Sequence, residues 1–172
     1  MTLQLGSNDL CLSCSIFTKK TGFLNAESFD GHIRRSLEKI RLNIPKTLVL
    51  LVGTFNVSHI VDLTHQNPAC EKVRKTPWAF VECPCAFIMP SMGKSRRQTM
   101  DEMAAQYNNK LNQISLDYQR AHYDDFAVIY DPSAQGTNIS SFPHDVRAFT
   151  FHFFFLLFFF SIFSSFYFLI WC

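Results

Sequence analysis

Apolar residues along the chain fall into short continuous runs and into longer stretches with helical spacing. The continuous runs over residues 2–5, 47–52 and 126–130 are typical of buried strands in a parallel sheet. Helical spacing over residues 28–42 and 99–118 predicts amphipathic helices between these strands. The strand, helix, strand order predicts an α/β fold in which right-handed crossovers connect parallel strands.

Each of the two predicted helices has one apolar face. We interpret the face of the longer helix as core rather than as a lipid-binding groove, because any helix that covers a sheet needs this spacing. Residues 57–64 predict a short helix, residues 67–93, rich in proline and cysteine, predict a cross-linked loop, and residues 132–143 predict a second loop. The apolar faces consist of Phe29, Ile33, Leu37 and Ile40 in the first helix and of Met103, Tyr107, Leu111, Ile114 and Tyr118 in the second.

Composition changes abruptly near Ala148, which divides the chain into a domain over residues 1–148 and a tail over residues 149–172. The tail contains no Asp, Glu, Lys or Arg and is dominated by phenylalanine. One interpretation is a C-terminal transmembrane helix, because about 20 apolar residues cross a bilayer. The other is translated noncoding sequence, because codons for Phe, Tyr, Cys and Trp begin with thymine, as do most for Ser and some for Leu. Both remain open at the level of sequence.

The first predicted strand leads into Gly6-Ser7-Asn8-Asp9. Gly6 permits a tight turn, and the Asn8 amide can donate a hydrogen bond to an oxyanion without titrating. The alternative is ordinary turn chemistry, since these residue types dominate turns. His59 and His65 lie at the predicted short helix, and nothing near them in sequence identifies either as a catalytic base.

Several segments together resemble the GDSL or SGNH hydrolase family, in particular its phospholipase B-like branch. The resemblance runs in one order over roughly residues 2–147 and implies a three-layer α/β/α, flavodoxin-like domain with a parallel sheet. It further implies hydrolysis of acyl esters of phospholipids or lysophospholipids through an acyl-serine intermediate, with no metal and no cofactor. The matching segments are the strand with Gly6, Asn8 and Cys11-x-x-Cys14, the run over residues 43–52, Asn67-Pro-Ala-Cys70, Glu82-Cys83-Pro-Cys85, and the run over residues 124–130.

This sequence also departs from the family's pattern. It contains no Gly-Asp-Ser nucleophile motif, no match to the second-block glycine and no Asp-x-x-His near its end, where His144-Asp145 has the wrong order. Of the family's catalytic residues, the resemblance therefore assigns only Asn8 to this chain, as a side chain of the oxyanion hole, with Gly6 forming the turn. We expect the nucleophile to lie upstream of this chain, the last helix to be missing, and the chain alone to be inactive and marginally stable.

A second function remains open beside this fragment of a lipase. A catalytically inactive binding protein could retain the hydrolase fold and use residues 149–172 as a membrane anchor. Both hypotheses place the parent protein outside the cell, secreted or membrane-associated, although no signal peptide is visible at the start of this chain.

The cysteines favour disulfides over a metal site. The Cys83-Pro-Cys85 pair has one residue between its members, which is short of the usual zinc-ligand spacing. For a secreted parent we expect Cys11 to pair with Cys14, and Cys70 to pair with Cys83 or Cys85. Two glycosylation sequons, beginning at Asn56 and Asn138, agree with a secretory route.

Charge adds little to this picture. The chain has 16 Lys and Arg against 14 Asp and Glu, which gives no support to nucleic-acid binding. The densest basic cluster is Lys94, Arg96 and Arg97, and we interpret it as a solvated loop rather than as a site for phosphate or a lipid headgroup.

Overall fold

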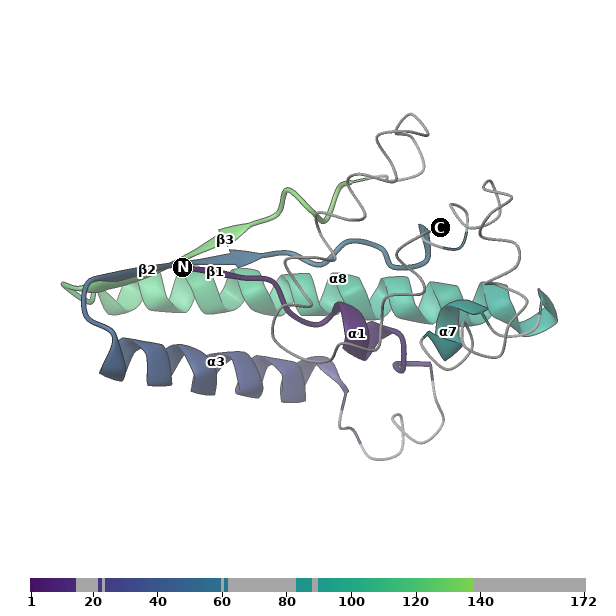
Figure 1. The fold of residues 1–172 in the computed structure, drawn as a ribbon, viewed down its shortest axis with the longest axis horizontal. Coiled ribbons are helices and arrows are strands. Elements are labelled where there is room, and N and C mark those ends of the chain that lie inside the picture. Colours follow the sequence, from purple (N-terminus) through teal and green to yellow (C-terminus); the bar gives the residue numbers. More distant parts are fainter. Residues whose placement is uncertain (15–21, 23, 60, 62–82, 88–89, 138–172) are drawn as a thin grey trace, which may run out of the picture.

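The computed structural model describes most of the first 137 residues (Figure 1). The described residues are 1–14, 22, 24–59, 61, 83–87 and 90–137, with the side chains of residues 90–92 excepted. Their strands are β1 (Thr2–Leu3), β2 (Thr47–Val52) and β3 (Phe126–Asp131), and their helices are α1 (Ser7–Leu10), α3 (Ala26–Asn43), α7 (Pro84–Phe87) and α8 (Pro90–Ala121).

The strands form a parallel sheet in the order β1, β2, β3. Thr2 lies opposite Leu50 in the first pair of strands, and Thr47 lies opposite Phe126 in the second. The predicted parallel α/β arrangement is thereby confirmed, and the strand over residues 47–52 has the predicted bounds. β1 is shorter than the predicted 2–5, because its pairing ends where the chain turns toward Gly6.

Helix α3 begins where its sequence supplies a cap. The Asn25 side chain accepts a hydrogen bond from the backbone N–H of Ser28 at 2.8 Å, which satisfies one of the free donors of the first turn. Phe29, Ile33 and Leu37 form the buried face, as predicted. Arg34 joins α3 to α8 through its ion pair with Asp117 at 2.7 Å.

Helix α8 is longer than predicted, because it begins at Pro90 rather than at residue 99. The basic cluster of Lys94, Arg96 and Arg97 therefore lies on a helix, and its assignment to a loop was wrong. Polar residues mask the helical pattern in this stretch. The predicted loop over residues 67–93 also contains the short helix α7 among its described residues.

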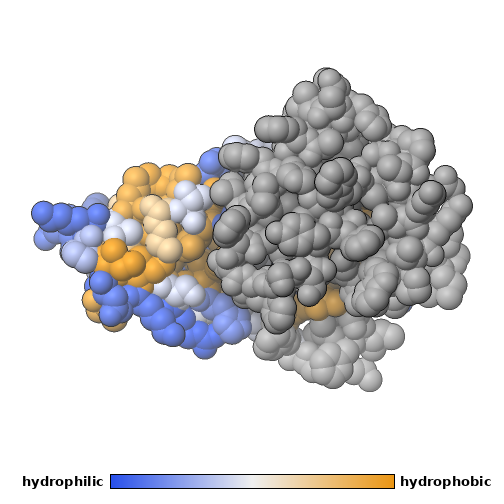
Figure 2. Space-filling model, viewed as in Figure 1, coloured by the Kyte–Doolittle hydropathy of each residue, from blue (hydrophilic) through white to orange (hydrophobic). Residues whose placement is uncertain are grey.

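Helices α3 and α8 pack against each other on one face of the sheet (Figure 1). Side chains on this face, including Val49, Leu51 and Val128, are almost completely buried. On the opposite face Leu48 is 52% exposed and Ile129 is 44% exposed. Figure 2 shows apolar surface on the left side of the molecule, where β2 and β3 lie in Figure 1. A sheet covered on both faces was expected from the continuous apolar run in β2, but the described residues form only two layers.

A side chain of α8 binds the outer edge of β3. The buried hydroxyl of Ser115 donates to the carbonyl of Val128 and accepts from the N–H of Tyr130, each at 3.1 Å. Backbone groups of successive residues in β3 point alternately toward β2 and away from it. Those of Val128 and Tyr130 point away from β2. Ser115 thus binds two backbone groups on the edge of β3 that faces away from β2, which partly satisfies that edge.

Within the part of the chain that the structure describes, no helix is long and apolar enough to cross a membrane. The apolar tail over residues 149–172 lies outside that part.

Candidate active site

The carboxyl ends of the parallel strands meet at one edge of the sheet, which is where α/β proteins place polar groups for binding and catalysis. β1 leads at this edge into Gly6 and α1, β2 into Gly53 and Thr54, and β3 into a turn that begins after Asp131. The Gly6 to Asp9 segment singled out in the sequence therefore lies where this fold builds a site.

Gly6 is required by both its backbone conformation and its surroundings. Its φ of 104° lies in the left-handed region that L side chains rarely adopt. A Cβ at this position would approach Tyr107 Cδ2 to 2.9 Å and Phe29 Cε2 to 3.1 Å. The rings of Phe29 and Tyr107 are stacked with centroids 4.0 Å apart, so the turn lies against a rigid aromatic surface.

Tyr107 anchors this surface from α8. Its ring is completely buried, and its hydroxyl donates to the carbonyl of Leu24 at 2.7 Å. Burial, with the nearby Asp9 carboxylate, raises the pKa of Tyr107, so the hydroxyl stays protonated at neutral pH. The sequence identified Tyr107 as core but gave no sign that it faces the Gly6 turn.

Asn8 is the second residue of α1 and is exposed. Among the described residues no hydrogen-bond partner is found for its side-chain amide. The amide can therefore donate to an oxygen atom of a bound molecule. Its role in an oxyanion hole stays a prediction.

Asp9 follows Asn8 in the same turn of helix. Burial raises the pKa of its carboxyl, and the positive charge of His32 opposes that rise in part. The turn thus holds an acid whose charged form is disfavoured beside a neutral amide that is free to donate.

The end of β2 is held by Asn108, which sequence reasoning missed. Its side-chain oxygen accepts from the Thr54 N–H at 2.7 Å, and its side-chain nitrogen donates to the Thr54 carbonyl at 2.8 Å. Asn108 and Thr54 are both buried. A Cβ at Gly53 would lie 2.9 Å from Tyr130 Oη and 3.1 Å from Asn108 Oδ1, so one of these side chains would have to shift. The sequence did contain one indication of this role, since Asn108 is a polar residue on the otherwise apolar face of α8.

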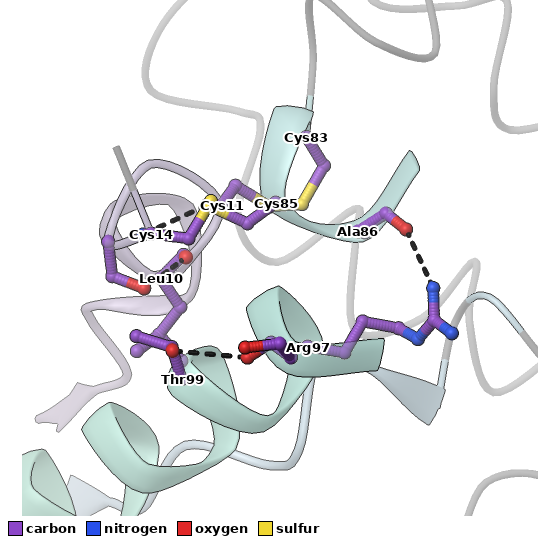
Figure 3. The surroundings of a disulfide bond; sticks show 10 residues. Leu10, Cys11, Cys14, Cys83, Cys85, Ala86, Arg97 and Thr99 are labelled. Carbon is purple, nitrogen blue, oxygen red and sulfur yellow. Dashed lines mark hydrogen bonds between the residues drawn. A yellow bond between two sulfur atoms is a disulfide. The ribbon is translucent and has the colours of Figure 1, made fainter. Parts of the chain in front are cut away.

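Two disulfides connect α1 to α7, and they correct the pairing expected from sequence (Figure 3). Cys11 pairs with Cys83, and Cys14 pairs with Cys85. The expected Cys11–Cys14 bond and the pairing of Cys70 with Cys83 or Cys85 are wrong, because the fold places the two short segments side by side. Disulfide use itself is confirmed, while Cys70 lies outside the described residues.

The other residues discussed from sequence form no catalytic arrangement within the described part of the chain. The Ser58 hydroxyl donates to Asp101 at 2.8 Å, and within the described part Nδ1 of His59 is buried without a hydrogen-bond partner. The sequon residue Asn56 is half-buried, while Asn138 and His65 lie outside the described residues. No cluster of three or more His, Cys, Asp or Glu able to hold a metal is found in the described ranges.

Asp62-Leu-Thr-His65 has the Asp-x-x-His spacing, but it follows β2 instead of lying near the end of the matching region. It also lies outside the described residues, and we assign it no role.

Comparison with known proteins gives one family and two curated relatives. The model of the GDSL-like lipase/acylhydrolase family matches residues 1–150. Phospholipase B1, membrane-associated, of Rattus norvegicus is 26% identical over 132 residues, which cover 77% of this chain and 9% of the relative. The protein of the same name in Mus musculus is 23% identical over 139 residues, which cover 81% of this chain and 9% of the relative. The chain thus spans about a tenth of the length of these relatives, and no solved structure matches it.

Proposed function

This chain belongs to the GDSL-like lipase/acylhydrolase family, and on that premise we propose that it is part of an enzyme that hydrolyses acyl esters of phospholipids or lysophospholipids. The observation that carries the proposal is the Gly6 turn at the carboxyl edge of the sheet, with the exposed Asn8 amide beside it. The substrate class follows from the names of the curated relatives.

In the proposed reaction a serine hydroxyl attacks the ester carbonyl carbon, and the carbonyl oxygen becomes an oxyanion. The Asn8 amide donates a hydrogen bond to that oxygen, an interaction worth about 3–4 kcal/mol in comparable enzymes. The alcohol then leaves with a proton, and water hydrolyses the acyl-serine to release the fatty acid and restore the hydroxyl. The Gly6 turn and the aromatic surface beneath it hold Asn8 in place.

We further propose that this chain alone does not catalyse the reaction. Its 172 residues contain no Gly-Asp-Ser motif, and an oxyanion donor without a nucleophile and base stabilises no transition state. The hydrolase domain is proposed to cover residues 1–148, and residues 149–172 are proposed to be either a membrane anchor or translated noncoding sequence. The names of the relatives favour a parent protein associated with a membrane.

Turnover of a p-nitrophenyl ester by the purified, disulfide-bonded chain tests the proposed inactivity. The wild-type chain and the Asn8→Ala variant should both hydrolyse the ester no faster than buffer. Wild-type turnover that disappears in Asn8→Ala would show that the chain carries a complete site. The alternative, a membrane-tethered binding protein that keeps the hydrolase fold, requires a folded monomer that binds phospholipid vesicles without hydrolysing them.

A further inference from the structure

The two disulfides join the same two short segments. The paired cysteines are far apart in sequence, by 72 positions in Cys11–Cys83 and by 71 in Cys14–Cys85. Cys11 and Cys14 lie in the turn that follows α1. Cys83 immediately precedes α7, and Cys85 lies within it. Once one bond closes this long loop, the second closes only a very small additional ring. Because loop entropy depends on loop length, the second bond adds little to global stability through the unfolded chain.

A second parallel bond instead restricts orientation. Two segments joined by one disulfide can still rotate about it, whereas two bonds prevent that rotation. Two hydrogen bonds add to this restriction. The Cys85 N–H donates to the Cys11 carbonyl at 3.2 Å. The Cys14 N–H donates to Cys85 Sγ at 3.0 Å (Figure 3). The cysteine cluster therefore sets the angle between α1, which carries Asn8, and α7.

Helix α7 is in turn fixed to the long helix α8. Ala86 is buried, and its carbonyl accepts a hydrogen bond from Arg97 Nη1 at 3.4 Å. Helix α1 has four residues, too few to be stable in isolation. Within the described part, Leu10, which is completely buried, and the close approach of Gly6 to the aromatic pair also attach it to the domain.

The two bonds differ in burial. Cys85 is 0% exposed and Cys14 is 7% exposed, so both ends of their bond are covered. Cys83 is also 7% exposed, but Cys11 is only partly buried. A thiolate from solution must reach a sulfur atom to attack it, and Cys11 is the most accessible of the four residues.

We propose that Cys11–Cys83 is a redox-sensitive lock on the Asn8 turn, opened by small thiols of the glutathione class before Cys14–Cys85 is reduced. One thiolate attacks Cys11 Sγ to form a mixed disulfide and release the Cys83 thiolate, which takes up a proton. A second thiolate attacks the sulfur of the small thiol and releases Cys11, which is protonated in turn. The protein gains two electrons and two protons, and the two small thiols leave as their disulfide.

Opening the lock frees the turn while the sheet and long helices stay folded. The amides of Leu10, Leu12 and Ser13 donate to the carbonyls of Gly6, Asp9 and Leu10, and their hydrogen exchange reports on the turn. The Tyr130 amide, held by Ser115 in the core, serves as the internal reference. The inference rests on the proposed function, which it makes dependent on the redox state of Cys11–Cys83. Its test measures thiol alkylation and amide exchange rather than hydrolysis, so the result does not depend on whether the proposed function is correct.

The full, oxidised chain is titrated with glutathione, free thiols are alkylated and mapped, and amide exchange is followed at each step. Cys11 and Cys83 should be alkylated at lower glutathione concentrations than Cys14 and Cys85. At that stage, exchange at residues 10–13 should accelerate by about tenfold or more, with Tyr130 unchanged. Simultaneous reduction of both bonds, earlier reduction of Cys14–Cys85, or unchanged exchange at residues 10–13 after Cys11–Cys83 opens would each overturn the proposal.

A matched pair of double variants tests the same lock without reductant. Cys11→Ser with Cys83→Ser should reproduce the accelerated exchange at residues 10–13, since Cys14–Cys85 remains. Cys14→Ser with Cys85→Ser removes the buried bond, and the remaining bond should then open over the same range of glutathione as in the wild type. If a variant loses protection at Tyr130 it has unfolded, and the wild-type titration alone decides the question.

Discussion

At the scale of single residues, the candidate site depends on a position where a side chain does not fit. Gly6 combines a left-handed backbone with contact against the stacked rings of Phe29 and Tyr107. The turn that presents Asn8 is therefore determined as much by a residue of α8 as by its own sequence.

Replacing Gly6 by alanine should lower the free energy of unfolding by about 1–3 kcal/mol, because strain in φ adds to a clash with Tyr107. Gly31→Ala is the matched control, since Gly31 lies within α3 and a Cβ there would meet nothing within 4 Å. That variant should gain about 0.5–1 kcal/mol. Urea unfolding of both variants checks this pair, and equal effects would refute the packing of the turn.

Asp9 predicts a pH dependence whose sign follows from its raised pKa. The folded state favours the neutral carboxyl, so this contribution to stability is complete below the pKa of the unfolded chain. It is lost as pH rises through the higher pKa of the folded state. Asp9→Asn should therefore raise the urea midpoint near neutral pH, and this gain should shrink below about pH 4.

Exposed Asp124 supplies the control for this experiment. Asp124→Asn should leave the urea midpoint unchanged both near neutral pH and below about pH 4. A loss of stability in Asp9→Asn near neutral pH would mean that the Asp9 charge is favoured in the folded state, contrary to the account.

At the scale of elements, side chains of α8 complete the backbone pairing of the sheet at two places. Asn108 holds the end of β2, and Ser115 binds two backbone groups on the outer edge of β3. Both are polar residues on the apolar face of the helix, so their hydrogen bonds fix how far α8 slides along the sheet.

Asn108→Ala should cost about 2–4 kcal/mol, because it leaves the buried N–H and carbonyl of Thr54 without partners. The neighbouring Asn109 is exposed on the same helix, and Asn109→Ala should change stability by less than about 0.5 kcal/mol. Thermal unfolding of the two variants measures the difference. Similar small effects in both would show that the Thr54 groups find other partners.

The elements also show which features a single sequence can predict. The strand over residues 47–52 was predicted with its bounds, because strands of parallel sheets often form continuous apolar runs, although only Val49 and Leu51 of this strand are buried. The start of α8 was missed because polar residues there carry no period. Disulfide pairing depends on which distant segments the fold brings together, and the partners of Asn108 depend on tertiary packing.

At the scale of the whole molecule, the described residues form two layers, with Leu48 and Ile129 exposed on the open face of the sheet. The family model matches residues 1–150, a range that includes all of the described residues. The candidate oxyanion turn, its aromatic support and its disulfides are all formed within the described residues.

The central claim, that Asn8 is an oxyanion donor, is tested most directly by a chimera. The 132-residue segment of the rat relative that matches this chain is replaced by the corresponding residues of the chain, and its phospholipase activity is compared with that of the Asn8→Ala form. The rate of the relative without the segment is subtracted from both. We predict a fall in kcat of about 100- to 1000-fold with KM nearly unchanged. An active chimera whose kcat does not change in Asn8→Ala would contradict the account.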